Sequence, residues 1–221
     1  MSSFFNLTLD TLPPQNVTLS VNDNALYTVD TSVMAVIATS DTDTTGYQMK
    51  IWGSVQNAET ENSAPWQTLS DSVNVMLIQG DGVKTVNLRV RDNVWNESAV
   101  VSRTIILDMT DPIVTITSGP DLTVISKIIG RDSTEFSFRV NKAFAEYRVR
   151  VVPNISSLHT AGAAIGIIGG SVNMNGIGNF AENSEINCTI KGSDLAAAAG
   201  TDGTHVIKIF ARDLSGRWSV V

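Results

Sequence analysis

Apolar and polar positions alternate along most of this chain, and turn-forming residues separate the alternating runs. The clearest run is residues 81–92, DGVKTVNLRVRD, and residues 202–213 repeat its plan as DGTHVIKIFARD. In both, Asp-Gly predicts a turn, every second residue is apolar, and an Arg-Asp pair closes the run. The apolar positions are Val86, Leu88 and Val90 in the first copy and Ile207, Ile209 and Ala211 in the second. The repeat predicts one half-buried strand in each of two homologous domains.

Further alternating runs predict the other strands of domain one. Residues 31–39 and 46–52 alternate in the same way, residues 53–66 are polar and loop-like, and residues 68–78 and 100–107 offer the remaining strands. The residues expected on one face of the first two of these strands are Met34, Val36 and Ala38, and Tyr47, Met49 and Ile51. About seven short strands separated by turns are typical of an immunoglobulin-like sandwich.

Domain two follows the same plan with one enlargement. A strand with Phe136, Phe138 and Val140 stands where residues 31–39 stood, and residues 147–151 match the strand 46–52. The insertion lies between these strands and the second Asp-Gly turn. Its body is expected at about 156–183, with the glycine- and alanine-rich run GAAIGIIGG at 162–170, and residues 193–200 predict a capped helical turn closed by glycine. We interpret the apolar run as a surface that becomes ordered against a partner.

Composition supports two small β domains. The chain has 221 residues, 43% of them hydrophobic, which is enough for two cores of about 100 residues each. Runs of helix-forming residues at helical spacing are missing, and Gly, Ser, Thr, Asn, Asp and Val dominate. We therefore predict an all-β chain of two tandem immunoglobulin-like sandwiches, with an N-terminal arm at 1–13, domain one at 14–108 and domain two at 109–221.

The N-terminal arm resembles the closing strand of domain one. Residues 5–20 align with residues 103–118, with Leu7 on Ile105 and Leu9 on Leu107. Domain two, in turn, stops about seven residues short of a matching closing strand, so its last strand is expected to be truncated. We hypothesise that the arm pairs with a neighbouring subunit or another protein, and that the open edge of domain two takes a strand from a partner. The alternatives are a disordered arm, an arm paired within domain one, and a domain two that tolerates six strands.

The residues expected to bind a partner are the apolar ones of the arm, the insertion and the C-terminus. They are Phe4, Phe5, Leu7, Leu9, Ile165, Ile167, Ile168, Val220 and Val221.

Net charge excludes some partners. The formal net charge is −7, and no Lys or Arg precedes Lys50, so a phosphate backbone would be repelled and nucleic acid is not expected as a partner. The first residues lack the features of a secretory signal, and no apolar run reaches the roughly 18 to 20 residues that span a bilayer. We expect no membrane insertion and a protein made and kept in the cytoplasm.

Candidate chemistry is sparse. His159 and His205 are the only histidines and Cys188 is the only cysteine, which we expect to be a small core residue; no nucleophile elbow or phosphate-binding loop occurs. We predict no enzyme activity, no catalytic residue and no cofactor. The possible calcium ligands are Asp41 and Asp43, and Asp108 and Asp111 between the domains, although Asp is also an ordinary turn residue. The four tryptophans, for which packing is favoured over a carbohydrate platform, are Trp52, Trp66, Trp95 and Trp218.

Several segments of domain one resemble a widespread bacterial and phage immunoglobulin-like module. They are Trp66, the strand start at 80–86, the turn at 91–93 with residues 96–98, and the linker at 107–112. The module typically carries a Trp, a Gly-Asp-Gly-x-Lys-x-Val strand, an Asp-x-x-Gly-Asn-x-Ser turn and a Leu-Asp-x-Thr-x-Pro linker. Val94 and Trp95 stand where the family commonly has a Gly, so this turn is expected to differ.

Domain two is similar to domains attached to phage and phage-tail-like particles, through residues 125–127, 151–153 and 210–219. The resemblance implies a non-enzymatic structural protein of the tail, baseplate or capsid exterior, located in a virion assembled in the host cytoplasm. Its implied partners are other virion proteins and copies of itself. The alternatives are a carbohydrate-binding or adhesive module of a bacterial surface or secreted protein, with a host surface glycan as partner, and an accessory domain of a hydrolase.

Overall fold

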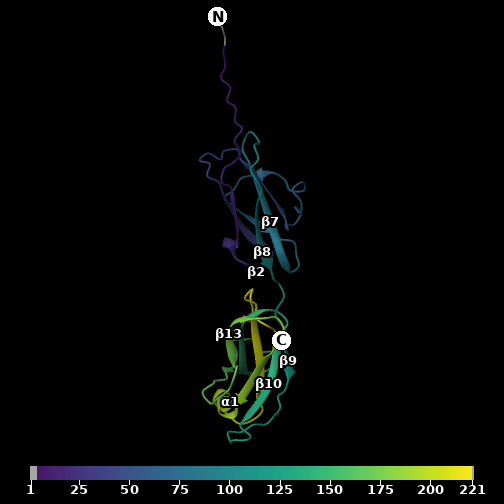
Figure 1. Cartoon of the computed structure of the whole chain (residues 1–221), viewed down its shortest axis with the longest axis vertical. Helices are drawn as coiled ribbons and strands as arrows, with labels where there is room; N and C mark the ends of the chain where they lie inside the picture. Colours follow the sequence, from purple (N-terminus) through teal and green to yellow (C-terminus); the bar gives the residue numbers. More distant parts are fainter. Residues whose placement is uncertain (1–3, 221) are drawn as a thin grey trace. The chain divides into compact units, whose positions relative to one another are not determined.

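The computed structural model of this protein describes residues 4–220 and is built mostly of β-strands joined by turns (Figure 1). Strands hold 42% of the residues and helix 5%, which confirms the predicted all-β class. The chain divides into two compact units, Met1–Met109 and Thr110–Val221, which are domain one and domain two in the structure. Each has its own hydrophobic core. Within residues 4–220, no helix is both long enough and apolar enough to cross a lipid bilayer.

Domain one is a sandwich of two sheets, ordered β1-β3-β6 and β2-β8-β7-β4-β5. The first sheet comprises β1 (Thr18–Val21), β3 (Ser32–Ala38) and β6 (Ser72–Met76), and the second comprises β2 (Tyr27–Thr28), β8 (Val101–Leu107), β7 (Gly82–Arg91), β4 (Gln48–Gly53) and β5 (Gln67–Thr68). A short 3-10 helix, η1 (Asn22–Asn24), follows β1. Neighbouring strands are antiparallel except β2 and β8, which run parallel. This division of strands is that of an immunoglobulin-like domain.

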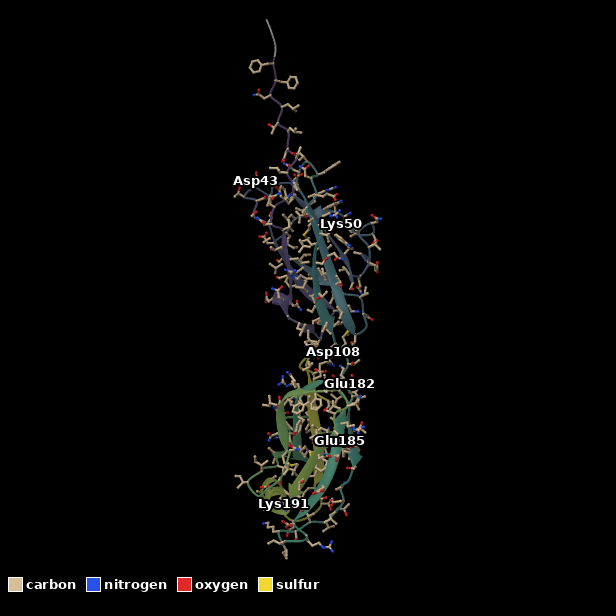
Figure 2. All side chains as sticks on the ribbon, in the orientation of Figure 1. Asp43, Lys50, Asp108, Glu182, Glu185 and Lys191 are labelled. Carbon is tan, nitrogen blue, oxygen red and sulfur yellow. The ribbon has the colours of Figure 1, made fainter. Side chains whose placement is uncertain are left out.

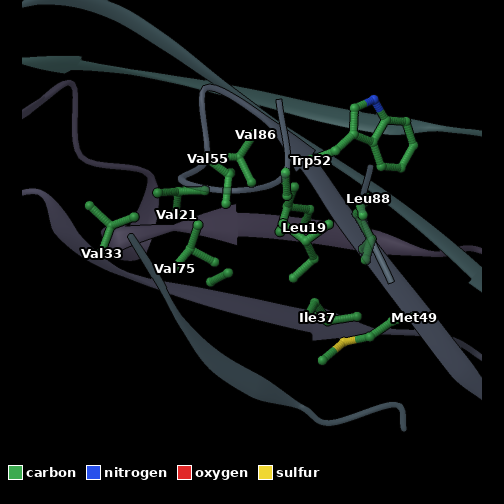
Figure 3. Packing of buried hydrophobic residues seen from close by; sticks show 14 of the residues in the cluster. Leu19, Val21, Val33, Ile37, Met49, Trp52, Val55, Val75, Val86 and Leu88 are labelled. Carbon is green, nitrogen blue, oxygen red and sulfur yellow. The ribbon is translucent and has the colours of Figure 1, made fainter. Parts of the chain in front are cut away.

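The core of domain one lies between these sheets, and β7 is central to it. Val86, Leu88 and Val90 are all 0% exposed, as the alternating pattern of residues 81–92 predicts. Figure 3 shows Val86 and Leu88 within the cluster that also contains Leu19 and Val33 of the other sheet. Burying each of these aliphatic side chains stabilises the fold by roughly 1.5–3 kcal/mol relative to leaving it in water.

The prediction for the strand at 31–39 chose the wrong face as the buried one. Met34 and Val36 are 41% and 40% exposed, and the inward face of β3 is formed by Val33, Ala35 and Ile37. The segment is apolar on both faces, so alternation alone does not choose between them. The choice is made by pairing, because β3 lies between β1 and β6, and Ile37 stands opposite the buried Leu19.

Domain two is also a sandwich of two sheets. One has the order β14-β10-β9, and in the other β11 pairs with β15 on one side and with β12 and β13 on the other. The strands are β9 (Val114–Ser118), β10 (Ser133–Val140) and β14 (Ile186–Lys191), and β11 (Phe144–Val152), β12 (Ala163–Ala164), β13 (Asn175–Phe180) and β15 (Val206–Asp213). The predicted helical turn is α1 (Gly192–Ala199), and it ends at Gly200, whose φ of +75° is left-handed.

The insertion of domain two contributes to the core rather than forming only a surface loop. Its strands β12 and β13 both pair with β11. Ile165 and Met174 are each 1% exposed, and Phe180 stacks on Phe144 with ring centroids 4.7 Å apart. The expectation that Ile165 lies on a partner-binding surface is therefore corrected, because this side chain fills the core of its own domain.

The insertion is also fixed to helix α1 through Asp194. One carboxylate oxygen of Asp194 accepts a hydrogen bond from the backbone N–H of Gly169 (2.7 Å), and the other accepts one from Ser171 (3.0 Å). Burial acts to raise the pKa of Asp194, but the hydrogen bonds from Ser171 and Gly169 outweigh it and hold the pKa below its usual value.

The repeated Arg-Asp pair heads the same turn in both domains. Oδ1 of Asp92 accepts hydrogen bonds from the backbone N–H groups of Val94 and Asn96, both at 2.9 Å. Oδ1 of Asp213 accepts the equivalent bonds from Ser215 (3.0 Å) and Arg217 (2.9 Å). Both aspartates are only 2% exposed, so each carboxylate is a buried anchor for the turn that follows its strand.

Replacing the anchor in domain one should destabilise the protein. Asp92→Ala leaves the two turn N–H groups without their acceptor, so we expect a loss of about 1–3 kcal/mol in the free energy of unfolding. Denaturant titration followed by tryptophan fluorescence measures it. The control Asp71→Ala alters an exposed aspartate and should change stability by less than about 0.5 kcal/mol. Equal effects of the two substitutions would contradict this role for Asp92.

Cys188 should be unreactive in the folded protein. It is 2% exposed, and burial raises the pKa of its thiol to about 12. Because only the thiolate reacts, and the raised pKa keeps the thiol neutral at pH 8, alkylation should be about a thousandfold slower than in the unfolded chain. Iodoacetamide labelling with and without guanidinium, read by mass spectrometry, measures this. Rapid labelling of the native protein would show that the thiol is accessible.

Candidate functional site

One edge of the second sheet of domain two is open. In domain one, β7 pairs with β4 along one edge and with β8 along the other. In domain two, the equivalent strand β15 pairs with β11. Along residues 4–220, the other edge of β15 meets only the end of the following turn, through a bridge from Arg212 to Trp218 and hydrogen bonds between Ala211 and Ser219. The backbone groups on this side of β15 before Ala211 therefore form a free sheet edge.

The apolar layer beside this edge is thinly covered. Aligning the two copies of the repeated sequence makes Ile207 and Ile209 the equivalents of Val86 and Leu88 in domain one. Val86 and Leu88 are 0% exposed, whereas Ile209 is 8% exposed and Ile207 is only partly buried. In domain one, β8 pairs along this edge, with Arg103 opposite Val86 and Val101 opposite Leu88. Its Ile105 and Leu107, opposite Lys84 and Gly82, are 1% and 0% exposed. Among its described residues, domain two therefore has a free sheet edge and no strand equivalent to β8.

The N-terminal arm carries apolar side chains in solvent. The exposed fractions of Phe4, Phe5, Leu7 and Leu9 are 90%, 85%, 86% and 84%. No strand is assigned to this segment, which is drawn as a thin extended stretch in Figure 1.

The base of the arm is tied to domain one. The side-chain amide of Asn96 donates to the backbone carbonyl of Asp10 (3.4 Å), and the backbone N–H of Gln15 donates to Asp41 (3.1 Å). The arm before Asp10 is thus presented from a fixed point.

The remaining partner-binding predictions divide between surface and core. Ile167 and Ile168 are 61% and 101% exposed at the tip of the insertion, and Val220 is 63% exposed, whereas Ile165 is buried. Val221 lies outside the described residues. Of the predicted partner-binding residues outside the arm, Ile167, Ile168 and Val220 are therefore on the surface.

The four tryptophans take different roles. Trp52 is 8% exposed and belongs to the core of domain one. Trp66 is partly buried, and its ring meets the ammonium of Lys50 at 4.6 Å and the guanidinium of Arg91 at 4.2 Å. Lys50 is labelled in Figure 2. These three residues form a cation–π stack on the outer face of the sheet.

Trp218 is held in a corresponding stack in domain two. Its ring lies 4.2 Å from the ring of His159 and 4.5 Å from the guanidinium of Arg148. Glu146 beside it forms ion pairs with Arg148 and Arg212. Burial acts to raise the pKa of Glu146, but the two arginines lower it below its usual value. Burial, with the charge of Arg148, also lowers the pKa of His159. These groups make a packed structural cluster.

Trp95 differs from the other tryptophans. It is 71% exposed, with the guanidinium of Arg91 5.1 Å from its ring. Its φ is +70°, and Gly216 occupies the same place in the turn of domain two with a φ of +94°. The left-handed conformation is uncommon for a bulky residue and costs on the order of 1 kcal/mol or more. Packing alone does not explain a solvent-exposed aromatic ring on a residue with a strained backbone. In the sequence, the only sign of this conformation is that Trp95 lies where the resembling module commonly has a Gly.

The predicted calcium ligands serve structural roles where the structure defines their contacts. Asp43, labelled in Figure 2, accepts a hydrogen bond from the backbone N–H of Thr45 at 2.9 Å. Hydrogen bonds from Thr45 lower the pKa of Asp43. Asp111 accepts one from Nε of Arg217 at 2.7 Å. Among the residues described, no three acidic, histidine or cysteine side chains gather closely enough to hold a metal ion.

Comparison with known proteins gives distant structural likenesses. No model of a known protein family matches the chain, and no curated protein matches it. The fibronectin(III)-like modules of Clostridium thermocellum CbhA align over 92% of this chain and 90% of that chain, at 7% identity and a TM-score of 0.39. The D00-D0 domain of intimin aligns over 93% and 95%, at 15% identity and a TM-score of 0.33. Chitinase ChiA74 from Bacillus thuringiensis aligns over 92% of this chain and 30% of its own, at 12% identity and a TM-score of 0.31.

These likenesses are too distant to carry a function over to this chain. The chain's own strand order and register make it a pair of immunoglobulin-like β-sandwiches.

Proposed function

We propose that this chain is a non-catalytic structural protein of a phage particle, which works by protein–protein contacts through its surfaces. The observation that carries the proposal is the free edge of β15, beside which Ile207 and Ile209 are less covered than their equivalents in domain one. An edge strand offers a row of backbone donors and acceptors to another chain, and natural proteins usually protect such edges. An edge left open beside apolar side chains is suited to assembly.

The chemistry of the surface supports contact rather than catalysis. A hollow of about 310 Å³ in domain one is lined by Val21, Asn24, Ser102, Arg103 and Thr104, a set without an acid or a histidine. A second hollow, of about 290 Å³, is lined by apolar and amide side chains such as Ile51, Gln56 and Val73. General acid–base catalysis needs ionisable groups that converge on one site. The arm and the insertion present exposed apolar side chains, as do several other loops and strands of both domains.

The placement in a virion rests on the resemblance of both domains to phage modules. It is supported by the strand start at 80–86 and by the C-terminal segment 210–219. The partners are then other proteins of the particle and copies of this chain, which meet in the host cytoplasm during assembly. Nucleic acid is not among them, because the net charge of −7 opposes binding to a phosphate backbone.

Purified particles test this proposal. Particles from a producing culture are separated on a density gradient, and their proteins are quantified by mass spectrometry. The chain is expected in the particle fraction at a fixed ratio to the major structural protein, and it should remain there after a wash in high salt. Its absence from intact particles, with the protein found only in the soluble or secreted fraction, would overturn the virion role.

Trp95 favours a second candidate, a carbohydrate-binding or adhesive module. Exposed aromatic rings pack against the apolar faces of sugars, and an adjacent cation such as Arg91 can bind their hydroxyl or acidic groups. The exposure of Trp95 and the strain in its backbone are the observations that favour this function.

Substitutions at Trp95 separate strain from binding. Because φ is positive there, Trp95→Gly should be more stable than Trp95→Ala by about 1 kcal/mol, measured by denaturant titration. Val94→Ala is the control that leaves the ring in place. On a glycan array, the structural function predicts no binding by wild type or variants. Binding by wild type and Val94→Ala, lost in both Trp95 variants, would instead establish the adhesive function.

A further inference from the structure

We propose that residues 5–10 of one copy of this chain add as a strand to the free edge that the start of β15 and residues 202–205 before it offer in a second copy. The second copy's domain two then gains the closing strand that β8 provides in domain one. This inference deepens the proposed function, on which it rests, by naming the partner of the open edge.

The arm has the pattern of a strand without a sheet. From Phe5 to Asp10 its residues alternate apolar and polar, with Phe5, Leu7 and Leu9 on one face. These apolar side chains are 84–86% exposed, and no strand is assigned to the segment. An amphipathic strand of this kind gains both backbone hydrogen bonds and burial when it joins a half-covered sheet edge.

The sequence of the arm matches β8, the strand that has no equivalent among the described residues of domain two. Leu7 and Leu9 align with Ile105 and Leu107 of β8, which are the residues that cover the core of domain one. Asp10 aligns with the aspartate that follows β8. The arm therefore carries the inward apolar positions of a closing strand at the correct spacing.

The pairing of β8 with β7 predicts the register of the arm on β15. Arg103 stands opposite Val86 and Thr104 opposite Thr85 in domain one. Transferred through the repeat, Phe5 lies opposite Ile207 and Asn6 opposite Val206, at the start of β15. Leu7 and Leu9 lie opposite His205 and Gly203, in the segment just before β15 whose equivalents in domain one pair with β8. Opposite residues of antiparallel strands point to the same face of the sheet. Phe5 then covers Ile207, the position whose equivalent in domain one is fully buried.

The edge of β15 fits the arm better than the matching site in domain one. There β7 already has strands on both edges, and β8 is itself covered by β2. Because each copy has a donor arm and an acceptor edge that are different surfaces, the contact is heterologous and repeats from one copy to the next. The predicted product is a head-to-tail series of copies.

Paired cysteines test the register. Asn6→Cys and Val206→Cys are made in separate full-length chains of different tag mass, mixed, and oxidised mildly, so that a mixed disulfide can form only between copies. Directly opposite residues in antiparallel strands are about 4.5–5.5 Å apart at Cα, which a disulfide spans. The control pairs Asn6→Cys with Ile116→Cys, an exposed residue of β9. We expect at least tenfold more mixed disulfide dimer from the first mixture.

Charge substitutions on the two faces of the arm test the packing. Leu7→Asp with Leu9→Asp changes the inward face, and Asn6→Asp with Thr8→Asp adds the same charge to the outward face. In sedimentation velocity up to about 200 μM, wild type and the outward variant should self-associate, and the inward variant should associate at least tenfold more weakly. Unchanged melting temperatures would show that the fold is intact in all three.

The inference is overturned by a wild-type chain that is monomeric throughout, or by mixed disulfide no more abundant than in the control. A disulfide within one chain carrying both cysteines, without mixed dimers, would also overturn it by placing the arm on its own domain two. Particle incorporation separates this outcome from the proposed function. If the inward variant no longer self-associates but still enters particles, the virion role holds and strand addition is not needed for it. If the chain self-associates through the arm but is absent from particles, strand addition holds and the virion role fails.

Discussion

Backbone hydrogen bonding at the edges of one sheet organises this protein. The strands β7 and β15 are copies of one sequence unit, and each leads into a turn anchored on a buried aspartate, Asp92 or Asp213. Among the described residues, the two copies differ in the number of neighbouring strands, because β7 is flanked on both sides and β15 on one. The same repeated sequence therefore has strands on both edges in one domain and an unpaired edge in the other.

The parts of the fold that could be predicted from sequence are those with local causes. The strands β7 and β15 follow from Asp-Gly turns and strict alternation, and α1 follows from its run of alanines with a closing glycine. The inward face of β3 could not be chosen, because residues 33–38 are apolar without a break. The burial of Ile165 was also hidden, since its glycine-rich surroundings resemble a loop and only pairing with β11 places it in the core.

The sequence predicts which segments form the candidate site, but not which side chains contact one another there. The likeness of the arm to β8 follows from aligning the chain with itself. The cation–π stack of Arg91 on Trp66 depends on the register that sets Gln48 opposite Arg91, which no local pattern specifies. Trp95 stands out in the sequence only as a departure from a familiar turn, and its conformation explains why glycine is the usual residue there.

The two oxygens of Asp194 have a consequence for the isoleucines at the tip of the insertion. After Ile167 and Ile168 in the chain, the backbone N–H groups of Gly169 and Ser171 donate to this carboxylate. Before them, Ile165 is buried in the core. The conformational entropy of the short exposed segment is thus largely lost when domain two folds. A molecule that later docks on these two side chains would find them preorganised, and little of its binding free energy would be spent on ordering them.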